Sequence, residues 1–193
     1  MASERQQQRT ASTMGLLLES ATRLFGERGY ANTSLEDIAL DCGLTIGAIY
    51  HHFGNKKALF SAVNEAAEQR IIAAGNKIAD CETPTQRLRS EWLAFLSLCN
   101  DPGFRQIVLI DSPNILGRDR WATSAVSLRA AAAGQQGAAG NRRHELTLRI
   151  LRGAMAEAAL ALAEAGNNRA TRQLVDDVIQ QWLAVVAQQL HVD

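Results

Sequence analysis

Residues 34–53 read SLEDIALDCGLTIGAIYHHF, and the order of caps, apolar positions and glycine in them predicts the structure of this region. Ser34 precedes an apolar periodic segment and Asp37 follows three residues later, which is the spacing of a capping box at the start of a helix. Gly43 permits the left-handed backbone that a sharp crossing requires. Thr45 then caps a second short helix. The spacing predicts two short helices joined by a tight turn, a helix-turn-helix.

A helix pair of this kind has two interpretations, an ordinary αα corner or a DNA-binding motif. Residues 34–53 alone favour neither. The surrounding charge favours DNA. No acidic residue lies between Asp41 and Glu65, whereas four basic side chains do: His51, His52, Lys56 and Lys57. The N-terminal segment from Arg5 to Leu18 is also free of acidic residues. Phosphate contact requires local positive charge and not a basic whole protein.

The composition predicts an all-α protein. The 193 residues include only three prolines, aromatic residues make up 5%, and 47% are hydrophobic. Alanine, the best helix former, is abundant, and proline is the worst. So few aromatic residues disfavour a β-sandwich or barrel. Lys+Arg and Asp+Glu number 20 each, which excludes a histone-like or ribosomal protein.

The sequence predicts a cytoplasmic protein with no membrane partner, metal or cofactor. Cys42, Cys81 and Cys99 form no CxxC pair, and their odd number indicates a reducing compartment. No apolar stretch approaches the roughly 18 residues that span a bilayer. Adjacent histidines on a helix point about 100° apart, so His51 and His52 are not expected to share a metal ion. We expect the polar residues 1–12 to form a mobile arm.

Helical periodicity continues on both sides of the motif. It predicts helices over 13–28, 56–78, 84–100, 102–117 (broken at Pro113), 118–133, 142–165 and 168–191. We expect two domains: a DNA-binding domain over 10–70, and a ligand-binding and dimerisation domain over 80–193. The motifs of hydrolases, nucleotide-binding enzymes and metalloproteases do not occur in the sequence, so an all-α enzyme is the less favoured class.

The segment FGERGYANTSLEDIALDCGLTIGAIYHHFGNKKALFSAV resembles the DNA-binding domain of the TetR family of transcriptional regulators, over roughly residues 13–64. LIDSPNILGRDRW, at 109–121, resembles a stretch found in the regulatory domain of many members. The resemblance implies a sequence-specific DNA-binding regulator, a ligand-responsive repressor that binds a near-palindromic operator as a homodimer. The alternative within this class is an orphan regulator without a small-molecule effector.

The resemblance implies DNA contacts at Thr33, Thr45, Ile46, Gly47, Ala48, Tyr50, His52 and Lys56, and we add His51 as a candidate for base readout. It places Thr33 and Lys56 at phosphates, residues 45–48 in the major groove, and Tyr50 and His52 at the DNA backbone. Many members carry a polar or basic residue where this chain has Ile46. An isoleucine can touch a thymine methyl but offers no hydrogen bond, so base readout rests on Thr45, His51 and close approach of the backbone.

The C-terminal half predicts an effector pocket within residues 84–165, and helix 56–78 is expected to couple it to DNA. A break at Pro113 would leave irregular packing where a cavity can form, and the effector is expected to be a small, largely apolar molecule. The candidate pocket residues are Trp92, Phe95, Leu96, Phe104, Val108, Asp111, Ile115 and Trp121. For Asp111 we favour a structural alternative, an Asp–Arg pair or a cap for the turn at Pro113.

The last two helices are the predicted dimer interface. The final one is apolar over so wide an arc that it must pack on more than its own domain, and the preceding helix is rich in alanine, which allows close approach. The alternative is that this arc completes the core of the monomer. The candidate interface residues are Met155, Ala158, Leu162, Ile179, Trp182, Leu183, Val186 and Leu190.

Overall fold

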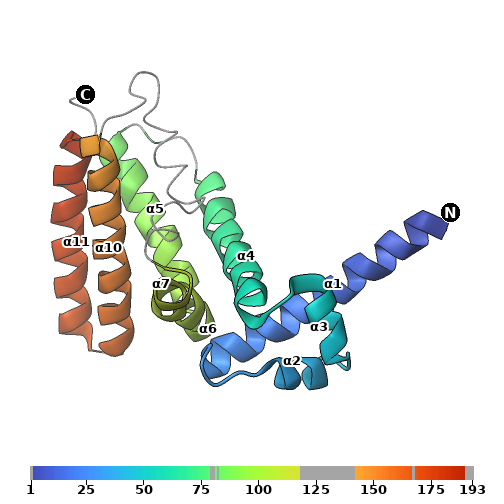
Figure 1. The fold of residues 1–193 in the computed structure, drawn as a ribbon. Helices are drawn as coiled ribbons and strands as arrows, with labels where there is room; N and C mark the ends of the chain where they lie inside the picture. The colour runs from blue at the N-terminus through green and yellow to red at the C-terminus, as the bar shows by residue number, and fades with distance from the viewer. Residues whose placement is uncertain (1, 79–80, 82, 118–141, 167, 190–193) are drawn as a thin grey trace. The chain divides into compact units, whose positions relative to one another are not determined.

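The computed structural model describes residues 2–78, 81, 83–117, 142–166 and 168–189. Every regular element in these ranges is helical (Figure 1). The helices are α1 (Ala2–Arg28), α2 (Leu35–Asp41), α3 (Ile46–Phe53), α4 (Lys56–Asn76), α5 (Pro84–Cys99), α6 (Pro102–Arg105), the π-helical segment η1 (Gln106–Asp111), α7 (Ser112–Ile115), α10 (Arg142–Glu164) and α11 (Arg169–Gln189). The all-α prediction is confirmed. None of the described helices is long and apolar enough to cross a membrane.

The chain divides into two compact units, neither of which is continuous in sequence. The first unit holds the described residues up to Ala67 together with 102–117, and the second holds 68–101 and the described residues from 142 onward. Helix α4 therefore contributes its first half to one unit and its second half to the other. The predicted domain boundary between 70 and 80 did not anticipate that 102–117 packs with the N-terminal helices.

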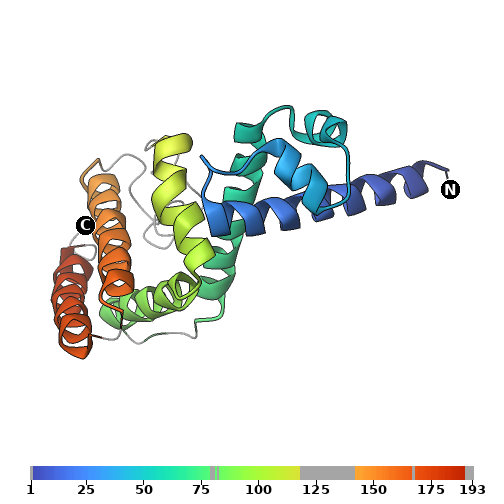
Figure 2. The same ribbon diagram turned by 90° about the horizontal axis from the view of Figure 1, so that it is seen from below.

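The apolar face of α1 forms the centre of the first unit, as the sequence predicted. Leu17, Ala21, Leu24 and Phe25 are all buried. The Phe25 ring meets the Phe60 ring of α4 edge to face, with centroids 5.3 Å apart. Helix α2 packs on α1, and α3 packs on α2 (Figure 2). These aromatic and aliphatic contacts support the helix pair 35–53.

Helix α1 begins at Ala2, so residues 2–12 are helical, which the sequence analysis did not predict; the mobility expected of residues 1–12 stays a prediction. Residues 2–12 read ASERQQQRTAS, in which alanine, glutamine, glutamate and arginine are all good helix formers. Their lack of large apolar residues means that this extension has no core-facing stripe, but it does not prevent a helix from forming. The helix propensity of these residues favours a helix here, whereas hydrophobic periodicity gives no signal in this segment.

The segment 102–117 is helical from Pro102 through Ile115, so the predicted break at Pro113 is wrong. The N–H of Ser112 donates to the carbonyl of Ile107, five residues back, which is the wide turn of a π-helix. A proline has no N–H for the carbonyl four residues back and its ring crowds that carbonyl. The wide turn just before Pro113 lets the helix pass through it without ending. The irregular packing inferred from a break therefore loses its basis.

The second unit is built around α5, α10 and α11. Helices α10 and α11 lie side by side, and α5 packs on both (Figures 1 and 2). Its buried side chains include Trp92 of α5, Leu151 and Ala159 of α10, and Leu183 of α11.

Candidate nucleic-acid interface

The two short helices have the caps that the sequence predicted. The Ser34 hydroxyl accepts the N–H of Asp37 at 3.0 Å, and the Asp37 carboxylate accepts the N–H of Ser34 at 2.9 Å, which completes the capping box. Hydrogen bonds from the hydroxyl and then the backbone of Ser34 hold the pKa of Asp37 below its ordinary value. The Thr45 hydroxyl accepts the N–H of Ala48 at 3.3 Å at the start of α3. Both helix starts are thus fixed by local hydrogen bonds.

The turn between α2 and α3 is closed by backbone geometry. Gly43 has φ +68°, in the left-handed region, and the N–H of Leu44 donates to the carbonyl of Ala39 at 2.9 Å. Ile38 and Ile49 are completely buried, one on each helix. The crossing of α2 and α3 is therefore held by both the turn and the apolar contacts, and this confirms the helix-turn-helix.

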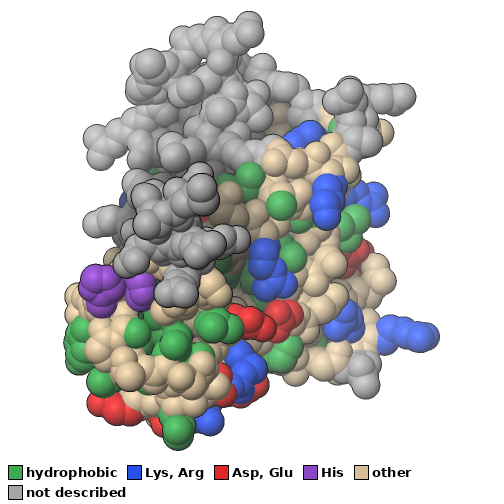
Figure 3. Space-filling view, turned by 90° about the vertical axis from the view of Figure 1, so that its right-hand side faces the viewer, with side chains coloured by type: hydrophobic (Ala, Val, Ile, Leu, Met, Phe, Trp, Pro, Cys, Tyr) green, Lys and Arg blue, Asp and Glu red, His purple; other side chains and the backbone are tan. Residues whose placement is uncertain are grey.

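One face of α3 is open to solvent. Gly47, Tyr50 and His51 are exposed and share a side of the helix, as does Gly54 at its end. Ile46, Ala48 and His52 are half-buried, and Thr45 is exposed at the cap. Histidine side chains gather at one place on the molecular face in Figure 3. The predicted recognition residues thus fall on an accessible helix face, with Gly47 offering the backbone itself.

Thr33 is a correction to the predicted DNA contacts. Its side chain is 1% exposed, and its hydroxyl donates toward the carbonyls of Gly29 at 2.9 Å and Leu24 at 3.2 Å. A threonine can satisfy itself by bonding to carbonyls at a helix end, which sequence spacing does not distinguish from an exposed hydroxyl. Thr33 closes the end of α1 and does not reach a phosphate with its side chain in this structure.

Lys56 is half-buried at the first turn of α4. Its ammonium Nζ lies 4.2 Å from the centroid of the Tyr30 ring, a cation–π contact. Burial lowers the pKa of Lys56, while the charges of Asp111 and Asp37 raise it. The Lys56 side chain, which is the predicted phosphate contact, therefore packs against Tyr30 in the turn that follows α1. Asn55 caps this helix, since its side-chain oxygen accepts the N–H of Ala58 at 2.8 Å.

Asp41, at the end of α2, is bound from α1, and sequence reasoning missed this link. The Ser20 hydroxyl donates to its carboxylate at 2.5 Å, and Arg23 also pairs with it. These two hydrogen bonds, the one from Ser20 first, lower the pKa of Asp41. The acidic residue that precedes α3 most closely in the sequence is thus tied to α1. Leu40 beside it is 83% exposed, an apolar side chain that the sequence pattern did not single out.

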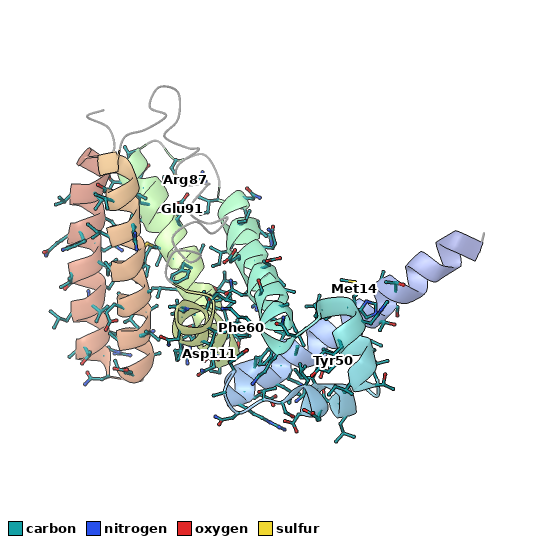
Figure 4. The ribbon with its side chains drawn as sticks, viewed as in Figure 1. Met14, Tyr50, Phe60, Arg87, Glu91 and Asp111 are labelled. Atoms are coloured by element: carbon teal, nitrogen blue, oxygen red, sulfur yellow. The ribbon has the colours of Figure 1, made fainter. Side chains whose placement is uncertain are left out.

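Asp111 has a partner that neither interpretation of the sequence anticipated. Its carboxylate accepts the backbone N–H of Tyr30 at 2.7 Å, across 81 positions in the chain. Its side chain makes no cap hydrogen bond at the start of α7, and a ligand contact at Asp111 stays a prediction. Figure 4 labels Asp111 on η1 and Phe60 on α4, and both belong to the first unit.

The predicted effector-pocket residues fall on two different units. Trp92, Phe95 and Leu96 lie on α5 in the second unit, while Phe104, Val108 and Ile115 lie in the segment packed with α1. Trp92, Phe104 and Val108 are buried, and the other three are half-buried. Trp121 lies outside the described residues. The pocket stays a prediction, now centred on α5.

The predicted dimer residues separate into core and surface. Ala158, Leu162, Ile179, Leu183 and Val186 are buried within the monomer, so the alternative of a completed core holds for them. Met155 is half-buried, and Leu190 lies outside the described residues. Trp182 is 46% exposed. The other exposed large apolar residues of α10 and α11 are Leu146, Ile150, Leu174, Val178 and Val185.

In the described residues no three His, Cys, Asp or Glu side chains come together as a metal site would require.

Both halves of the chain match known families. Residues 17–63 match the family described as bacterial regulatory proteins, tetR family, and residues 85–185 match the tetracyclin repressor-like C-terminal domain. The second match alone covers more than half of the chain, and it includes segments placed in both units.

Curated relatives match over only part of the chain. The regulator AcrR of Shigella flexneri is 44% identical over 64 residues, which are 33% of this chain and 30% of AcrR. TtgR of Pseudomonas putida is 40% identical over 65 residues, 34% of this chain and 31% of TtgR. The alignments therefore span about a third of the length of these relatives.

Solved structures match over nearly the whole chain. A TetR-family regulator from Pectobacterium atrosepticum has 28% identity and a TM-score of 0.61, and the match covers 93% of this chain and 96% of that one. FadR of Bacillus subtilis, solved with stearoyl-CoA, has 16% identity and a TM-score of 0.64, with coverage of 89% and 96%, and shows the shared fold. These named relatives are transcriptional regulators, and none is an enzyme. The chain belongs to the TetR family of bacterial transcriptional regulators.

Proposed function

We propose that this protein is a ligand-responsive transcriptional repressor that binds a near-palindromic operator as a homodimer. The observation that carries the proposal is the solvent-exposed face of α3, where Gly47, Tyr50 and His51 lie together on a helix fixed at both ends. Because its proposed target is chromosomal DNA, we place the protein in the cytoplasm. The second candidate is the same DNA-binding regulator without an effector.

DNA recognition follows from what α3 presents. The absence of a side chain at Gly47 lets the helix backbone approach the groove, and exposed Tyr50 and His51 supply polar atoms. The half-buried Ile46 offers a methyl-bearing side chain for a thymine. No acidic residue occurs from position 42 to 64, so phosphates approaching this surface meet no fixed negative charge in that segment.

The exposed apolar stripe of α10 and α11 is the proposed dimer surface. Leu174, Val178, Trp182 and Val185 follow one face of α11. Leu146 and Ile150 lie on α10, and exposed Gly153, where an added Cβ would meet nothing within 4 Å, continues their face. An extended apolar surface of this kind marks a protein–protein interface, and a glycine permits close approach of a second helix. A homodimer that binds two half-sites on one face of DNA requires its recognition helices to lie about 34–36 Å apart.

The effector side of the proposal rests on α5. Trp92 is completely buried, and its indole N–H has no hydrogen-bond partner among the described residues; the side-chain amide nitrogen of Gln180 on α11 is in the same situation. Both unpartnered atoms are neutral donors, and α5 and α11 pack together. A buried donor without an acceptor costs about 1–3 kcal/mol. A neutral, apolar molecule that carries a ketone, ester or lactone oxygen would remove that cost.

The test begins with a duplex selected from random-sequence DNA by the purified protein. We expect a footprint with inverted symmetry and binding of the protein to the duplex as dimers. A footprint without inverted symmetry would contradict the homodimer proposal. Heptanone and heptane are then compared as agents that release this duplex. The ketone is expected to act at lower concentration in the wild type, and Trp92→Phe, which keeps an aromatic ring but removes the N–H, is expected to abolish that difference. Failure of neutral ligands of both kinds to change operator affinity would favour the regulator without an effector.

A further inference from the structure

The turn after α1 is held by a residue from far along the chain. Gly29, with φ +78°, ends α1, so the next N–H, that of Tyr30, lies beyond the helical hydrogen-bond ladder. The Asp111 carboxylate accepts this N–H at 2.7 Å. That length is typical of a hydrogen bond to a charged acceptor, which is stronger than a neutral one. We call the contact between Asp111 and the Tyr30 N–H the turn anchor.

The segment that carries Asp111 has little freedom to move relative to α1. A Cβ at Gly26 would lie 2.9 Å from the Cα of Gly103, so α1 and α6 meet backbone to backbone. A Cβ at Gly29 would lie 3.2 Å from the amide nitrogen of Gln106 and 3.7 Å from the Asp111 carboxylate. The π-helical turn before Pro113 places Asp111 at the end of η1, where it meets the turn. The close packing of α6 on α1 thus fixes the position of the segment that carries Asp111.

The turn that Asp111 anchors also contacts helices of the DNA-binding region through the Tyr30 side chain. The Tyr30 ring stacks on Phe25 at 5.7 Å and meets Phe60 edge to face at 5.1 Å. Lys56 lies over the same ring, 4.2 Å from its centroid, and Asp111 attracts the Lys56 charge. Tyr30 therefore connects the end of α1 with the start of α4, on either side of the helix-turn-helix. A change in its backbone position moves both.

We propose that Asp111 is a positioning residue for DNA binding, which places the turn at Tyr30, and with it Lys56, in the geometry that an operator requires. The inference rests on the proposed function and deepens it, because it assigns a DNA-binding role to a segment outside the helix-turn-helix. Asp111 does not touch DNA in this mechanism. It acts through the Tyr30 backbone, which places the Tyr30 ring and with it the Lys56 ammonium.

Three variants of the chain of residues 1–193 test the role. Asp111→Asn keeps an oxygen that can accept the Tyr30 N–H, Asp111→Ala removes the acceptor, and Asn114→Ala changes an exposed residue one turn further along as a control. We measure affinity for the selected duplex and for a scrambled duplex at fixed salt, with amide hydrogen exchange at Tyr30. Asp111→Ala is expected to lose about tenfold in operator affinity, or roughly 1.4 kcal/mol, together with exchange protection at Tyr30. Asp111→Asn is expected to retain most of both, and Asn114→Ala to match the wild type.

A double-mutant cycle separates positioning from a general loss of stability. If Asp111 acts through Lys56, the effects of Asp111→Ala and Lys56→Ala on operator affinity are not additive; additive effects would overturn the role. Unchanged operator affinity in folded Asp111→Ala, or an Asp111→Asn variant as weak as Asp111→Ala, would also overturn it. If the wild type binds no DNA in the selection, the proposed function fails as well. If the wild type binds and only the Asp111 variants behave otherwise than expected, this inference fails alone.

Discussion

Replacing Gly26 by alanine tests how 102–117 is seated on the DNA-binding helices. The new Cβ would lie 2.9 Å from the Cα of Gly103, where ordinary contact is 3.4–4 Å, so the two backbones must separate by roughly half an ångström to one ångström. Overpacking of this kind costs about 1–3 kcal/mol. Alanine in place of glycine inside a helix returns about 1 kcal/mol. Gly26→Ala is therefore expected to lower the free energy of unfolding by up to about 2 kcal/mol.

Gly15 provides the matched control, since it lies in the same helix and a Cβ there would meet nothing within 4 Å. Gly15→Ala is expected to raise the free energy of unfolding by about 1 kcal/mol through helix propensity alone. Urea denaturation at one fixed protein concentration measures both variants, so that dimerisation contributes equally to each. The two values should differ by about 1–3 kcal/mol. If both alanines stabilise the protein equally, 102–117 does not rest on α1 as described.

Lys56→Ala should weaken binding to operator and scrambled duplexes alike and reduce the salt slope of the binding constant by about one, measured by titrations at several salt concentrations; a change of sequence preference alone would contradict a phosphate contact. Trp182→Glu should yield a folded monomer in analytical ultracentrifugation because this side chain is 46% exposed, whereas Val186→Glu, at 9% exposure, should unfold the protein by burying a charge, at a cost of several kcal/mol; a dimeric Trp182→Glu would place the interface elsewhere. The pKa of Asp37 is lowered in the folded state, so its stabilisation is present above the ordinary carboxyl value near 4 and is lost as the pH falls through the lower folded value. Thermal melts of Asp37→Asn should therefore lie below the wild type at pH 7 and converge with it in acid, with exposed Glu36→Gln as the control, and an equal deficit at all pH values would refute this account.

The local features of the fold were predictable because they depend on neighbours in the sequence. The capping box of Ser34 and Asp37, the left-handed Gly43 and the buried stripe of α1 each need only a few consecutive residues, and all were confirmed. The predicted break at Pro113 was wrong because a π-helical turn before it accommodates the missing N–H and the proline ring without ending the helix. A proline excludes a regular α-helical hydrogen bond, but it does not specify how the chain responds.

Contacts between distant segments escaped prediction, and these determine the site. The Asp111 carboxylate and the Tyr30 N–H are separated by 81 positions, and no periodicity in one segment reports on the other. Thr33 was expected at a phosphate because spacing gives its position and not its burial. The arc on α11 was recognised as unusually wide, but only the packed structure separates buried Leu183 from exposed Trp182.

The discontinuous first unit limits how this regulator can be recombined with others. A hybrid that joined residues up to about position 70 to the effector-sensing half of another family member would lack 102–117, and its α1 would lose the surface that meets Gly26 and Tyr30. Sensor exchange in such a protein needs two splice sites, or a donor whose own sixth helix fits the glycine at position 26. The part of this chain that would have to be transferred with the DNA-binding helices therefore consists of two separate sequence segments. Hybrid regulators that transfer the N-terminal segment alone should bind their operator more weakly.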